Sequence, residues 1–486
     1  KHRSDGPEAH DALTIKPDHP MGARHMPFSP LRFLASLAII AGLTLSAAAQ
    51  DRIALDLDSG RRLAQEALLS GNPALARELA QGLLQANPND RTAWVLLAAA
   101  LPQLGDAAGG QRAGARAFSL SRTETEKYEA ARLTALAAMR AERLTQSQLW
   151  LRRAAIHASN ETQEQQTARD YRLVANRNPL RIDLAFALTP SSNLNGGSEG
   201  AYNIIDGLPF VGVLSGDAQA LSGIEARGDL SLRYRLEDSE TRQRFLTARL
   251  IGRGVRLSDA ARATAPEAEN RDYAYLVADL GYGARRATDT LGYGWGMNVG
   301  RVWGGAEADV SYSFARLSGD GTYALSDRAA AQVFSSIETR WDSAGAQDAR
   351  IGTIGTGLTW VADGAMAGQY AVSLSLRHTE SPTPNDRSDV ATAQLSFAPA
   401  QAIGPASMRF TLGGAMSDYP DYAVVFVVPG GRQDTMGFAS VEVTPADWSF
   451  AGFAPVLTLT RQITRSNVSR FDTAEISLQI GIRSTF

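Results

Sequence analysis

The chain ends on the sequence TAEISLQIGIRSTF, residues 473–486. Its even positions are apolar from Ala474 to Ile482 and finish on Phe486, whereas its odd positions are polar or small. A period of two is that of a β-strand with one apolar face. One such strand is compatible with a soluble β-sandwich or with an outer-membrane barrel, whose strands are about ten residues long and apolar on the lipid side. The number of similar strands elsewhere therefore decides the fold.

The same alternation recurs over residues 181–188, 229–236, 370–377 and 408–413. Further candidate strands lie near residues 245, 274, 291, 308, 335, 355, 393, 438 and 456. With the terminal strand the total is about fourteen, and an even number suits a single-chain barrel with both ends in the periplasm. We therefore predict a 14-stranded antiparallel outer-membrane β-barrel over residues 179–486, in which the first strand pairs with the last.

Arginines in the alternating segments indicate which face is internal. An arginine on the lipid face at mid-membrane costs roughly 2 to 4 kcal/mol. The following arginines are therefore predicted to face a wet, charged lumen: Arg233, Arg235, Arg249, Arg253 and Arg377.

Long polar segments indicate the connections between strands. Residues 189–223, 258–270, 378–388 and 418–433 fall on the extracellular side when strands are counted from the first. Residues 318–328 are also predicted to be a long connection, although the count places it on the periplasmic side. Either one strand boundary is wrong there, or this connection folds into the lumen or toward the helical domain.

The region before the strands, residues 50–178, is rich in Ala, Leu, Arg, Glu and Gln with apolar spacings of three and four, which predicts helices. Helices expected at 61–69 and 73–85 place Ala76 and Ala80 at the small interhelix positions of a tetratricopeptide repeat, and Trp94 opens a second unit. A periplasmic TPR-like domain with a concave binding surface is therefore predicted. An ordinary helical bundle remains the alternative.

The first residues of the chain carry the features of an export signal. Residues 1–25 are predicted to be an unstructured extension. Residues 26–49 then provide Arg32, a short apolar core and Ala47-Ala48-Ala49, which are typical of a signal peptide. The chain has no cysteine and a formal net charge of -3, so it offers neither a disulfide framework nor a nucleic-acid footprint.

No catalytic constellation is evident in the sequence. Of 6 histidines only His378 lies in the strand-rich region, which argues against a histidine metal cluster or a Ser/His/Asp site there. We therefore predict no enzymatic activity, no cofactor and no metal.

Three short motifs together carry a resemblance to one protein family. One runs from residues 171–179 into Leu188-Thr-Pro-Ser-Ser-Asn193-Leu-Asn195 and is similar to that family's entry into the barrel. The next is Gly452-Phe453-Ala-Pro455, followed by Arg461 and by Ser466-Asn467-Val468, which is similar to its penultimate strand and hairpin. The last is the terminal Phe486, expected to be a signal for the outer-membrane insertion machinery.

The family that these motifs resemble is that of the surface lipoprotein assembly modulators (Slam), the outer-membrane translocons of type XI secretion. This resemblance implies a translocon that moves a surface lipoprotein or secreted protein from the periplasm across the outer membrane. The expected partners are that client, outer-membrane lipid, the barrel assembly machinery and periplasmic chaperones, with no nucleic acid. An exopolysaccharide export porin with periplasmic TPR repeats is the alternative, and a plain porin comes third because it leaves the helical domain without a role.

Overall fold

The computed structural model describes residues 56–484 apart from 210, 305–310, 343–344, 346–347, 446–447 and 449–452. The predicted extension and signal peptide, Gly452 and Phe486 lie outside the described residues. The helices and strands below all belong to one compact unit, Leu57–Phe486. Among the helices of the described residues, none has both the length and the apolar character needed to cross a membrane.

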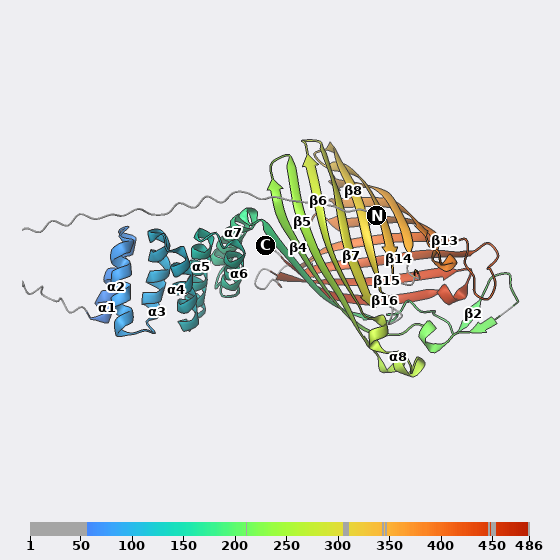
Figure 1. The fold of residues 1–486 in the computed structure, drawn as a ribbon, viewed down its shortest axis with the longest axis horizontal. Helices are drawn as coiled ribbons and strands as arrows, with labels where there is room; N and C mark the ends of the chain where they lie inside the picture. The colour runs from blue at the N-terminus through green and yellow to red at the C-terminus, as the bar shows by residue number, and fades with distance from the viewer. Residues whose placement is uncertain are drawn as a thin grey trace, which may run out of the picture. The chain divides into compact units, whose positions relative to one another are not determined.

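From residue 56 onward, where the description begins, seven α-helices precede the first strand (Figure 1). They are α1 Leu57–Leu69, α2 Pro73–Ala86, α3 Arg91–Ala100, α4 Ala107–Leu120, α5 Glu124–Arg140, α6 Leu144–Ile156 and α7 Glu161–Arg177. Side-chain caps fix several starts: the Asp90 carboxylate accepts from Ala93 N, and Thr123 and Glu126 form a capping box at α5. The two helices expected at 61–69 and 73–85 are confirmed as α1 and α2, with α1 beginning four residues earlier.

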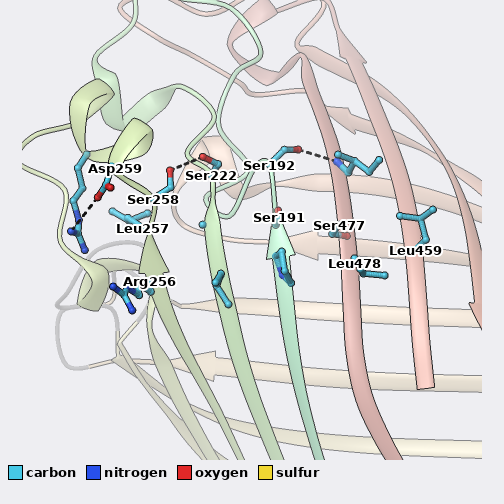
Figure 2. Close-up of a pocket in the computed structure, with 15 residues that line it drawn as sticks. Ser191, Ser192, Ser222, Arg256, Leu257, Ser258, Asp259, Leu459, Ser477 and Leu478 are labelled. Carbon is cyan, nitrogen blue, oxygen red and sulfur yellow. Dashed lines mark hydrogen bonds and ion pairs between the residues drawn. The ribbon is translucent and has the colours of Figure 1, made fainter. Parts of the chain in front are cut away.

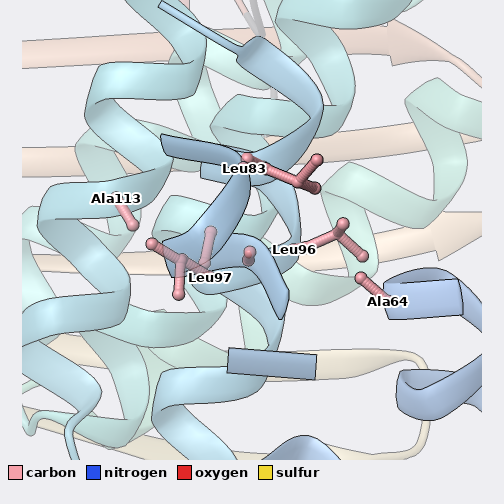
Figure 3. Packing of buried hydrophobic residues seen from close by; sticks show 8 residues of the cluster. Ala64, Leu83, Leu96, Leu97 and Ala113 are labelled. Carbon is pink, nitrogen blue, oxygen red and sulfur yellow. The ribbon is translucent and has the colours of Figure 1, made fainter. Parts of the chain in front are cut away.

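Alanine lets successive helices pack closely. Ala64, Ala80 and Ala93 are fully buried, and Leu83 and Leu96 fill the space between them (Figure 3). Small residues at the contacts bring helix axes near one another, so each helix is buried against its sequence neighbours. The result is an array of helix pairs, as stacked helical repeats require.

The remainder forms a closed antiparallel barrel of fourteen strands, which confirms the predicted fold. Its strands are β1 Leu180–Ser191, β4 Gly223–Asp238, β5 Arg242–Leu257, β6 Tyr275–Ala287, β7 Leu291–Gly304, β8 Ser311–Ser326, β9 Ala329–Trp341, β10 Ala349–Ala362, β11 Gly368–Glu380, β12 Ser388–Pro399, β13 Ala406–Tyr419, β14 Arg432–Pro445, β15 Phe453–Ser466 and β16 Thr473–Ser484. A separate hairpin pairs β2 Tyr202–Ile204 with β3 Val211–Val213.

The predicted pairing of the first and last strands is also confirmed, because β1 closes the barrel against β16. On its other edge, β1 is in register with β4 along its whole length, from Leu180 to Ser191. Against β16 the register pairs are Ala187 with Gly481, Leu188 with Ile480 and Ser191 with Ser477. Within the described residues, the closing seam is therefore paired mainly toward the end of β1.

The prediction of a long connection at residues 318–328 is wrong. Residues up to Ser326 belong to β8, and a tight turn leads to Ala329. Gly319 and Gly321 look like loop residues in the sequence. In the sheet they belong to the regular ladder opposite Trp295 and Tyr293 of β7, and the side-chain atoms nearest to them are those of Ser335 and Val333 of β9.

With that correction, the long connections gather at one barrel end. There the segments 192–222, 258–274 and 420–431 join strands, whereas the opposite end has short turns such as 239–241 and 288–290. We call these the loop end and the helix end, because α7 enters β1 at the latter.

The two faces of the barrel wall differ sharply. On β1, Ile182, Leu184 and Phe186 are 48%, 64% and 47% exposed, and the first two are in register with Leu232 and Leu230 of β4. Another outward row stacks aromatic rings across β10 to β13, Trp360 on Tyr370 and Tyr370 on Phe397. Apolar side chains exposed around a closed barrel form the surface that lipid covers in an outer-membrane protein.

Candidate functional site

The inward face of the barrel is lined by charges that largely pair with one another. Arg249 bonds Asp229, and Arg253 bonds Glu225 at 2.8 Å. Across β8 and β9, Glu338 receives both Arg316 and Arg340, the latter at 2.6 Å. Because these pairs alternate with serine and threonine, the interior is polar and mixed in sign and suits water.

The remaining arginines of the predicted lumen set have different surroundings. Arg233 lies on the inward face, with its guanidinium 4.2 Å from the centre of the Phe245 ring. Arg377 shares the inward face of β11 with Ser373 and Ser375. Both positions alternate with outward apolar residues along their strands.

Arg235 does more than line the wall. Its guanidinium donates to the backbone oxygens of Asn176 and Asn178 at 2.6 Å each, where α7 ends and the barrel begins. The Asn178 side chain in turn bonds Thr145 and Gln148 of α6. This chain of hydrogen bonds fixes the path from the last helices into β1.

Asn193 and Asn195 shape the first connection at the loop end. The Asn193 amide spans a turn, since it donates to Gly197 O at 2.8 Å and accepts from Gly197 N at 2.9 Å. The Asn195 amide donates to the oxygens of Asp217 and Gln219 and accepts from Leu221 N at 2.9 Å. Both side chains therefore stabilise backbone of the segment 192–222, which we call the first loop.

Arg253 attaches the first loop to the inner wall. Besides pairing with Glu225, its guanidinium donates to Leu194 O at 2.8 Å and to Tyr273 O at 3.2 Å. Leu194 itself is buried in an apolar cluster with Leu221 and other residues of this end. The first loop is thus held against the wall of the barrel mouth.

The second motif lies on both ends of β15. At the helix end, Phe453 stacks under the Arg152 guanidinium of α6 at 4.5 Å, and Pro455 is in register with Ile482 on the outward face. At the loop end, Ser466 Oγ accepts from Val468 N, and Asn467 exchanges hydrogen bonds with Gln433 and Gly431. These residues shape the hairpin and connect it to β14.

An arginine that the sequence analysis did not single out lies where two connections meet at the loop end, residues 420–431 and 467–472. Arg432 pairs with Asp434 at 2.7 Å, both about 10% exposed, and lies 3.7 Å from the Tyr419 ring centre and 3.5 Å from that of Phe471. Next to it, Ile205 of the first loop packs with Tyr422, Val428 and Val468. We call the Arg432 pair and this cluster the loop clasp. No local pattern in the sequence marks this group, because Tyr419 precedes Arg432 by 13 residues and Phe471 follows it by 39.

Burial in the loop clasp raises the pKa of Tyr422, which lies between β13 and β14. The clasp also connects the first loop to the hairpin before β16, since Ser469 Oγ donates to Tyr202 O and Ile204 N donates to Ser469 Oγ. Loops that lie on either side of the closing seam are therefore tied together over the barrel mouth.

Within the part of the chain that the structure describes, no group of three His, Asp or Glu side chains is arranged to hold a metal ion. The interior instead provides a polar path, and the connections at its loop end are bound to one another and to the wall. Such a path can pass hydrophilic solutes or extended polypeptide, provided that the loops open.

No protein-family model and no curated protein matches the chain. Among solved structures, a bacterial polysaccharide outer membrane secretin aligns at 10% identity over 62% of this chain and 98% of its own, with a TM-score of 0.32. The TodX monoaromatic hydrocarbon channel deltaS2 mutant aligns at 9% identity over 64% and 91%, with a TM-score of 0.35. The Yersinia enterocolitica type III secretion translocator chaperone SycD aligns at 14% identity over 25% of this chain and 84% of its own, with a TM-score of 0.23. TM-scores this low support no conclusion about function.

Proposed function

We propose that this protein is an outer-membrane translocon that moves a polypeptide from the periplasm to the cell surface. The observation that carries the proposal is the direct passage from an array of helix pairs into a closed barrel whose interior is lined by paired charges. Outer-membrane barrels have short periplasmic turns and long external loops. The loop end then faces outward and the helices lie in the periplasm.

The barrel's size and lining suit a polypeptide. Eight strands leave an interior just filled by side chains, whereas sixteen to eighteen leave an aqueous channel, and fourteen lie near the open limit. Peptide groups need hydrogen-bonding partners throughout the crossing, and a hydrated polar wall supplies them. Ion pairs such as Arg253 with Glu225 balance the two signs, so neither acidic nor basic segments are held strongly.

The finer proposal is a Slam-type translocon of type XI secretion. Its client is a surface lipoprotein or a secreted protein, which stacked helix pairs hold on the periplasmic side before transfer. Periplasmic chaperones deliver the client, and the barrel assembly machinery inserts the translocon itself. Folding of the client outside, or its release from a chaperone, supplies the driving force.

The experiment that tests this function measures surface display of a candidate client in cells with and without the gene. Intact cells are treated with protease, and the client is followed by immunoblot beside a periplasmic control protein. We expect the client to become resistant to the protease when the gene is deleted and sensitive again when the full chain is restored. Cell-surface polysaccharide is measured in parallel.

Equal client display in both strains, with loss of polysaccharide, would show an exopolysaccharide exporter instead. Equal display with normal polysaccharide but reduced uptake of small solutes would show a porin.

A further inference from the structure

A groove of about 660 Å³ lies at the loop end of the wall, across the seam where β1 meets β16 (Figure 2). One outward-facing register row forms its floor. From β5 to β15 this row is Arg256, Ile224, Pro190, Leu478 and Leu459. The floor is therefore apolar and lies on the lipid side of the barrel, with a cation at its β5 end.

The rim of this groove toward the loops is polar. The hydroxyls of Ser222 and Ser258 bond each other at 2.8 Å, and Ser192 Oγ accepts from Ile476 N at 3.0 Å (Figure 2). Asp259 and Arg262 of the short helix α8 Asp259–Thr264 complete the rim. Hydroxyl and charged groups above an apolar floor match the headgroup and acyl chains of a lipid.

A second lipid-side cation lies beside the β15 end of the groove. Arg461 is in register with Ala439 of β14 and with Ile476, which lines the groove. It is exposed and lies between Leu459 and Ile463 on the apolar face. The guanidinium groups of Arg461 and Arg256 make no hydrogen bond or ion pair with any residue that the structure describes.

Two unpaired arginines on the lipid face need a counter-charge from outside the protein. Placing a guanidinium among acyl chains costs free energy. Ionisable groups in contact with lipid therefore occur mainly where a group of opposite charge or a hydrogen-bonding partner is at hand. Phosphate is the partner that the planar arginine fork binds best, through two parallel hydrogen bonds. Four strand spacings separate β5 from β15, which is about 19 Å and is shortened by the reach of both side chains.

We propose that this groove binds an outer-leaflet glycolipid whose sugar headgroup carries two phosphates, one facing Arg256 and the other Arg461. Its acyl chains lie on the floor formed by Ile224, Pro190 and Leu478. The sugar contacts the serine rim. Because the groove covers the outer side of the seam, the bound lipid also stabilises the closed barrel.

The test uses the purified full-length protein in detergent, with binding measured by native mass spectrometry and by the rise in unfolding temperature. The probes are bisphosphoryl lipid A, monophosphoryl lipid A and phosphatidylglycerol. We expect the bisphosphoryl form to bind most tightly and the monophosphoryl form about tenfold more weakly. Arg256→Gln and Arg461→Gln should each weaken the bisphosphoryl form about tenfold, and the double variant should abolish the preference between the two forms.

Arg409→Gln is the matched control, because it removes the same charge from the inward face of β13. It should bind like the parent protein. Heat-modifiable migration on a gel shows that each variant is folded. Ile224→Trp provides a second approach, since it fills the floor while leaving both arginines in place, and it should also weaken binding.

Equal binding of the three lipids to the parent protein would overturn the proposal, because it would show only the general attraction of an anionic lipid to the rim. Unchanged affinity in the folded double variant would overturn it equally. Neither result depends on transport, so the lipid site and the translocon function stand or fall separately.

Discussion

Replacing Asn195 with alanine tests whether one side chain stabilises the first loop. Its amide makes two hydrogen bonds of 2.8 Å to Asp217 O and Gln219 O and accepts from Leu221 N at 2.9 Å. A hydrogen bond contributes about 1 kcal/mol net, and less when exposed, as the bond to Asp217 is. The three together stabilise the loop by about 2 to 3 kcal/mol.

Because about 1.4 kcal/mol changes an equilibrium tenfold, local opening of the first loop should rise roughly 30- to 150-fold in Asn195→Ala. Hydrogen exchange measured by mass spectrometry on peptides covering residues 192–222 reports this opening. The exchange of peptides in β10 and β11 should not change, because the closed barrel does not depend on the loop.

Asp206→Ala is the matched control in the same loop. That side chain is exposed and makes no hydrogen bond or ion pair to the residues that the structure describes. Its exchange should equal that of the parent protein. Identical exchange in Asn195→Ala and Asp206→Ala would refute the assignment of loop stability to the Asn195 amide.

Three further predictions follow from charged groups. Arg432→Met should destabilise the loop clasp by about 3 kcal/mol, because it leaves the Asp434 carboxylate buried without its cation; hydrogen exchange near residue 422 measures this, and adding Asp434→Asn should restore most of the protection. The His157 hydrogen bond holds the pKa of Glu124 below its ordinary value of 4.5, so its contribution to helix stability is complete above pH 4.5 and is lost as the pH falls through the lowered pKa. Helical circular dichroism in acid should therefore decline at a higher pH in Glu124→Gln than in the parent protein, and identical acid profiles would contradict this. Arg253→Gln should free the first loop from the wall and enlarge single-channel conductance in planar bilayers, whereas unchanged conductance would show that the loop does not obstruct the path.

The sequence was sufficient to predict the barrel because membrane strands repeat a local rule. Every second residue of β16 is apolar, from Ala474 to Ile482, and the same rule located the other strands. The rule failed at residues 318–326, where Gly319 and Gly321 suggested a loop. Their place in β8 depends on pairing with Trp295 and Tyr293 of the neighbouring strand, and register across strands is not readable from one segment.

The site residues were less predictable because their roles depend on distant partners. The Asn195 amide bonds backbone that lies 22 to 26 residues away, whereas the Asn193 amide bonds the nearby Gly197, although the two residues are alike in the sequence. Arg432 gains its role from Tyr419 and Phe471, which converge only when the last hairpin folds back. The local sequence pattern predicts the strands of the barrel wall. The contacts that hold the loops at its mouth join residues far apart in the sequence, and a local pattern does not show them.

Arginines on the inner and outer faces of the barrel wall differ in where their negative partner comes from. Inside, Arg249 and Arg253 have carboxylates of the chain itself, so the path stays near neutral and holds no passing segment of one sign strongly. Outside, Arg256 and Arg461 lie among apolar residues without such partners, although an arginine there is costly. A barrel that needed only to keep arginine away from lipid would place both of these inward as well. Their outward position indicates that the membrane itself completes the wall beside the seam, where β1 and β16 share few register pairs.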